Sequence, residues 1–105
     1  MKKYKIVITK KAEENYINSF IYYEKQQEGL GLRFENEVSK TLSAICYRPL
    51  LFQRKYKHYR EAILKVFPFV IIYEFNINII VVMDIFHVKR NPKKTGLAAA
   101  DRQKK

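Results

Sequence analysis

Two long apolar runs in the second half of the chain constrain its fold more than any other feature. "FVIIYEF" (69–75) and "IIVVMDIFH" (79–87) are rich in β-branched and aromatic residues, and "NIN" (76–78) connects them. Such residues favour strands, and a short connection containing Asn is typical of a hairpin turn. Both runs are apolar at almost every position, which predicts central strands that are covered at least partly on both faces.

The first half of the chain supplies two amphipathic helices as a cover. An alternating pattern at 3–9 predicts a strand, and apolar residues spaced by three and four across 12–23 then predict a helix. The glycines of "EGLGL" (28–32) predict a turn or a helix C-cap. A second apolar stripe over 34–45 predicts another helix, which Pro49 ends. Helices joined by so short a turn must pack antiparallel.

Together these elements predict an α+β fold. Residues 52–67 add one or two strands, because turn-like polar residues around Lys57 and His58 are followed by alternating polarity over 59–66. The predicted order is β-α-α-β-β-β(-β), with the helical hairpin packed on one face of a mainly antiparallel sheet of 4–5 strands. Residues 1–92 form this single domain. The basic tail at 93–105 is predicted to be frayed or to form a short helix.

The charge of the chain indicates the chemistry of its partners. The formal net charge is +11, from 21 Lys and Arg against 10 Asp and Glu. Residues 48–105 hold 13 of the basic and 4 of the acidic side chains, so this part carries +9. Such a field attracts phosphate backbones or an acidic protein, and it predicts an association that weakens with salt.

Several classes of protein are disfavoured. Cys46 has no second cysteine to pair with, and no apolar run is long enough for a signal peptide or a membrane span. We therefore expect a cytoplasmic protein with no membrane partner. Cys46, His58 and His87 lack the spacing of a zinc site, and no Gly-rich phosphate loop is present. We expect neither a metal nor a cofactor.

Several motifs together resemble the RelE/ParE superfamily of toxins from type II toxin–antitoxin modules, often labelled plasmid-stabilisation proteins. The resemblance covers about residues 4–93. It is carried by "YKIVITKKAEENY", by "FENEVSKTLSAICYRP", and by "YREAILKVFPFVIIYEF" followed by "IIVVMDIFHVKRNPKK". The most specific part is the series of an Arg-bearing strand, Phe-Pro-Phe before Ile-Ile-Tyr, and a last strand that ends in His before Arg-Asn-Pro.

The resemblance implies a toxin that a cognate antitoxin neutralises with an acidic segment, in a toxin–antitoxin hetero-oligomer or with the toxin as a homodimer. ParE-like members inhibit DNA gyrase and so block replication. RelE-like members are ribosome-dependent endoribonucleases that cut mRNA without a metal, and they commonly carry a tyrosine shortly after the last strand. This chain has no tyrosine after Tyr73. We therefore expect a ParE-like inhibitor of gyrase and of growth, with mRNA cleavage as the alternative, so whether the chain is an enzyme stays open.

Cleavage of RNA would need a base, an acid, and cations that stabilise charge on the phosphate. His87 is the candidate acid or base because His titrates near neutrality. Arg60 and Arg90 are the candidate phosphate anchors because Arg binds phosphate bidentately. We expect the strand end at His87 and Arg90 to lie beside Arg60. The candidates for contacting nucleic acid or another target are Lys55, Lys57, His58, Lys89, Lys93 and Lys94.

The two main candidates also have structural interpretations. His87 has the strand parity of the apolar residues Ile79, Val81, Met83 and Ile85, so it is either catalytic or an inert cap on an apolar face. Arg60 shares parity with apolar positions further along its own strand. It is therefore either a strand-end charge that reaches to water or a buried anchor with a partner.

Overall fold

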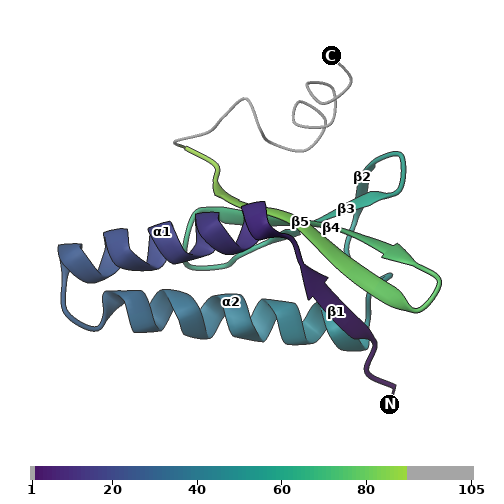
Figure 1. The fold of residues 1–105 in the computed structure, drawn as a ribbon, viewed down its shortest axis with the longest axis horizontal. Helices are drawn as coiled ribbons and strands as arrows, with labels where there is room; N and C mark the ends of the chain where they lie inside the picture. Colours follow the sequence, from purple (N-terminus) through teal and green to yellow (C-terminus); the bar gives the residue numbers. More distant parts are fainter. Residues whose placement is uncertain (1, 90–105) are drawn as a thin grey trace.

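The computed structural model describes residues 2–89 (Figure 1). The predicted tail at 93–105 lies outside these residues, as do the candidates Arg90, Lys93 and Lys94. The described elements are β1 (Lys5–Ile8), α1 (Lys10–Gln26), α2 (Leu30–Tyr47), β2 (Arg54–Tyr56), β3 (Tyr59–Ile63), β4 (Phe69–Asn76) and β5 (Ile79–His87). Their order confirms the predicted succession of one strand, two helices and the remaining strands.

The five strands form one mixed sheet in the order β1-β5-β4-β3-β2. β1 is parallel to β5, whereas β5, β4, β3 and β2 are antiparallel to their neighbours. The two apolar runs, β4 and β5, are therefore interior strands, as predicted. Figure 1 shows α1 and α2 side by side, joined by a short turn at the left of the view. The predicted α+β fold with a helical hairpin on the sheet is confirmed.

Local interactions fix the ends of the two helices. The Thr9 side chain accepts a hydrogen bond from the Ala12 N–H at 3.2 Å, which satisfies one of the free donors in the first turn of α1. Gly29 precedes α2 with φ of 87°, a left-handed conformation that glycine adopts without strain. The Glu24 carboxylate accepts from the Gly29 and Gly31 N–H groups. The predicted turn at these glycines is confirmed.

Apolar side chains are buried on both faces of the sheet. The main core joins the helices to β3, β4 and β5, with Phe34 of α2 packed against Phe69 of β4 at 4.8 Å between ring centroids. A smaller cluster on the other face contains Val70, Ile72 and Phe86. This double burial explains why the two runs are apolar at both parities.

A bulge in β5 changes which side chains face the helices. Ile72 pairs with Asp84, but the next residue of β4, Tyr73, pairs with Val82, so Met83 is an extra residue. Val82 and Ile85 consequently belong to the same core although their parities differ. The prediction that His87 shares a face with Ile79 and Val81 is therefore wrong, because strand parity holds only until a bulge shifts it.

Candidate functional site

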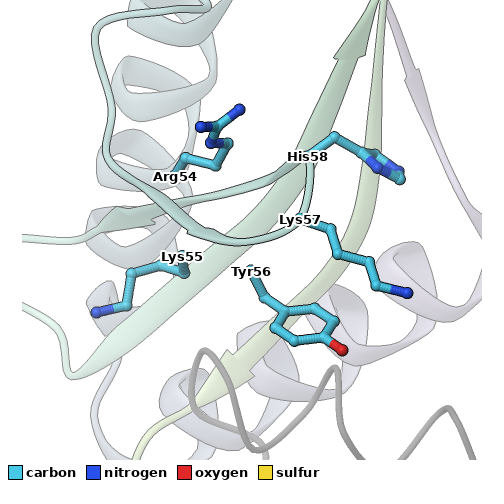
Figure 2. A pocket seen from close by; sticks show the side chains of 5 residues that line it. All are labelled: Arg54, Lys55, Tyr56, Lys57 and His58. Carbon is cyan, nitrogen blue, oxygen red and sulfur yellow. The ribbon is translucent and has the colours of Figure 1, made fainter.

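The basic hairpin tip, residues 54–58, brings together three of the predicted target-binding residues, Lys55, Lys57 and His58. β2 and β3 pair antiparallel, and the turn between them is tight enough to hold Lys57 at a φ of 50°. An open hollow of about 550 Å³ is lined by Arg54, Lys55, Tyr56, Lys57 and His58. Figure 2 shows that these five side chains leave the hairpin in different directions. They can contact an extended polyanion or an acidic surface, but they do not close around a single phosphate.

Carboxylates on β3 and β4 pair with two of these side chains. His58 Nε2 lies 2.7 Å from Glu74 Oε1, and Lys55 Nζ lies 3.7 Å from Glu61 Oε1. The Lys57 ammonium lies 5.4 Å from the centre of the Tyr56 ring. Within residues 2–89 neither Arg54 nor Lys57 forms an ion pair with a carboxylate. The tip therefore keeps cations that are free to meet an anionic partner.

Arg60 is an anchor, but its partners are backbone carbonyls. Its Nη1 donates to the Phe52 carbonyl at 2.7 Å and, more weakly, to the Leu50 carbonyl at 3.5 Å. The Tyr73 hydroxyl donates to the Pro49 carbonyl at 2.6 Å. Burial raises the pKa of Tyr73 to about 12, although the nearby charge of Arg60 acts in the opposite direction. Arg60 and Tyr73 thus tie down the segment that links α2 to β2.

His87 is bound at the opposite end of β4. Its ring packs edge-on against Phe69, with centroids 5.1 Å apart. Its Nδ1 accepts a hydrogen bond from the Lys89 N–H at 3.0 Å, which places the proton of the neutral ring on Nε2. His87 therefore has structural contacts of its own, and Lys89 takes part in them through its backbone.

The register of the sheet separates His87 from Arg60. His87 is opposite Phe69 on one side of β4, and Arg60 is opposite Tyr73 on the other side. Four residues of strand span roughly 13 Å, and the two intervening strand spacings add further distance. The prediction that the strand end at His87 lies beside Arg60 is wrong. The individual catalytic and binding roles of the site residues remain predictions.

Two adjacent leucines in the segment between α2 and β2 form a prominent surface that was not predicted from the sequence. Leu50 and Leu51 are 62% and 55% exposed. The signal was present in "RPLLF" (48–52), because two large apolar residues follow the proline that ends a helix and belong to no helical or strand pattern.

The residues that the structure describes offer no group of three or more His, Cys, Asp and Glu side chains that could hold a metal ion. Within the same residues, no helix is both long and apolar enough to cross a membrane.

A comparison with family models identifies the family of this chain. The model of the family described as "ParE toxin of type II toxin-antitoxin system, parDE" matches residues 6–92. Among solved structures, a chain of the chromosomal ParDE toxin–antitoxin system from P. aeruginosa is similar in fold, with a TM-score of 0.71 and 13% sequence identity. That match covers 81% of this chain and 96% of the other. No curated protein matches the chain significantly in sequence.

Proposed function

Because this chain belongs to the ParE toxin family of type II toxin–antitoxin systems, we propose that it inhibits DNA gyrase and that a cognate antitoxin neutralises it. Inhibition of this kind needs a binding surface and no reacting groups. The basic hairpin tip offers such a surface, with cations that leave it in several directions (Figure 2). The cytoplasm, where gyrase acts on DNA, is the proposed site of action.

The observation that supports inhibition over mRNA cleavage is the separation of His87 from Arg60. General acid–base cleavage of RNA requires a proton donor and a cationic anchor at the same phosphate. In this sheet the two residues are opposite Phe69 and Tyr73 of β4, and the Arg60 guanidinium binds loop carbonyls. Cleavage of mRNA by these residues would require a rearrangement of the sheet.

A supercoiling assay with purified gyrase and relaxed plasmid tests the proposal directly. The purified chain should reduce supercoiling in proportion to its concentration, and His87→Ala should inhibit as well as the wild type. Ribosomes programmed with a defined mRNA provide the opposing assay. Ribosome-dependent cleavage that His87→Ala abolishes, together with unaffected supercoiling, would overturn inhibition in favour of the nuclease alternative.

The target-binding role of the basic hairpin tip has its own test. Lys55→Ala and Lys57→Ala should each raise the concentration needed for half-inhibition of gyrase about threefold at low salt, and less at high salt, because salt screens exposed charges. Lys25→Ala removes an exposed lysine from α1 and is the matched control. Equal effects of all three substitutions would show that only the overall charge matters.

A further inference from the structure

The apolar ridge, which we define as Leu50 and Leu51, is exposed yet firmly held. Arg60 and Tyr73 donate hydrogen bonds to three carbonyls in the ridge and beside it, those of Pro49, Leu50 and Phe52. The Leu51 N–H also donates to the Arg48 carbonyl at 3.0 Å. A surface fixed in this way loses little conformational entropy when a partner binds, so it is preorganised for recognition.

Two hollows adjoin the ridge, and Leu51 lines both. One, of about 510 Å³, lies against Leu50 and Leu51 and is also lined by the aromatic side chains of Tyr4, Tyr47 and Phe75. The other, of about 660 Å³, lies between α2 and the segment that links β3 to β4. Its lining includes Ile63 and Val66, which are 66% and 70% exposed. Four large apolar side chains, those of Leu50, Leu51, Ile63 and Val66, are thus exposed around the two hollows, and such a grouping favours a protein-binding site.

The rim of the two hollows is positively charged. Arg48 lines the first hollow, and Arg33, Lys40 and Lys65 line the second. Among the described residues that line either hollow, Glu37 is the one carboxylate.

The Glu37 carboxylate neutralises little of the positive charge of the rim, because backbone N–H groups already bind it. Its carboxylate accepts hydrogen bonds from three successive N–H groups, those of Lys65, Val66 and Phe67. A partner of this surface therefore needs apolar side chains for the ridge and carboxylates for the rim.

We infer that the apolar ridge and its two hollows bind the neutralising segment of the antitoxin, an amphipathic and acidic peptide. The inference rests on the proposed neutralisation and assigns it a surface. Leu50 and Leu51 would pack against apolar residues of the segment, and the rim cations would pair with its carboxylates. A second copy of this chain fits poorly, because each copy carries +11. Arg60 then acts as a positioning residue that holds the ridge in shape.

A phage-displayed library of random 16-residue peptides, panned against the purified full-length chain, tests the inference without a known antitoxin. The enriched peptides should combine apolar residues with Asp or Glu. Leu50→Asp and Leu51→Asp should each weaken their binding at least tenfold in fluorescence anisotropy. Ile21→Asp, at an apolar residue 45% exposed on α1 that lines neither hollow, should stay within twofold of the wild type. Circular dichroism verifies that each variant is folded.

Arg60 supplies a second readout that does not require a change at the ridge itself. Arg60→Ala should weaken peptide binding and speed hydrogen exchange at the Leu51 amide, whereas Arg60→Lys should restore part of both, since Lys also donates to carbonyls. Unchanged exchange and binding in Arg60→Ala would remove its positioning role.

Several results would overturn the inference. Panning could enrich no peptides, or it could enrich peptides without carboxylates. Alternatively, Lys55→Ala could abolish peptide binding while Leu50→Asp leaves it intact. A ridge-binding peptide should also restore supercoiling by gyrase in the presence of the toxin, and failure to do so would overturn the neutralising role of the ridge. If the wild-type chain never inhibits gyrase, the proposed target is wrong, while the panning and exchange results still decide the docking surface.

Discussion

The apolar ridge and the basic hairpin tip are neighbours in sequence but are stabilised in opposite ways. The ridge exposes apolar side chains, and hydrogen bonds from Arg60 and Tyr73 fix the backbone carbonyls on either side of it. The tip exposes cations, and ion pairs with Glu61 and Glu74 hold part of it at the surface. Fixed apolar surfaces contribute affinity and specificity, whereas exposed charges mainly accelerate encounter and are screened by salt. The two segments therefore suit different kinds of contact with a partner.

The largest effect on stability is expected in alkaline solution at Tyr73, which supports the segment that carries the ridge. The pKa of Tyr73 is about 12 in the folded chain against 10.0 ordinarily, so between these pH values the folded state binds more protons than the unfolded state. Stability from this group is complete below about pH 10 and is lost as the pH rises to about 12, a loss of about 3 kcal/mol.

Urea denaturation of the wild type and of Tyr73→Phe measures this loss. Tyr73→Phe should be less stable by about 1 kcal/mol at pH 8, because the Pro49 carbonyl loses its hydrogen bond. Its free energy of unfolding should decline less than that of the wild type above pH 10. Parallel pH profiles would mean that Tyr73 does not titrate differently on folding.

A somewhat smaller effect is expected when the other support of the ridge is removed. Arg60→Ala leaves the Phe52 carbonyl without its 2.7 Å donor, which should lower the free energy of unfolding by about 2 kcal/mol. Arg54→Ala removes the exposed arginine directly opposite on β2 and should cost less than about 0.5 kcal/mol. Thermal or urea unfolding of both variants compares them, and equal losses would mean that Arg60 does not support the loop.

The smallest effect is expected at the basic hairpin tip. The His58 side chain is 63% exposed, so its ion pair with Glu74 should contribute less than about 1 kcal/mol despite a separation of 2.7 Å. Glu74→Gln should therefore change the stability only slightly at pH 6, and 1 M salt should reduce the difference further. A loss comparable to that of Arg60→Ala would show that the tip is as firmly built as the ridge.

Sequence patterns predicted the elements of the fold because their causes are local. The helical spacing after Thr9 and the short turn at Gly29 both depend on residues close together in the chain. Parallel pairing of β1 with β5 has no such local signal, so the strand that β1 joins was not predicted from the sequence.

The candidate site was harder to predict than the fold. The bulge at Met83 reverses the faces of β5 without any marker in a run that is apolar at both parities. The partners of Arg60 are main-chain carbonyls of a loop, which side-chain chemistry does not reveal. Lys55 and Lys57 are exposed, as expected for lysine side chains, which are rarely buried.

The pairing of β1 with β5 also has a consequence for biosynthesis. The ribosome releases β1 and both helices first, whereas β5, which must lie between β1 and β4, is the last strand of residues 2–89 to emerge (Figure 1). A nascent chain that stops before Ile79 therefore lacks the partner of Lys5 and cannot complete the sheet. Interrupted translation therefore yields fragments with an incomplete sheet, and the toxin domain can fold only after β5 has been synthesised.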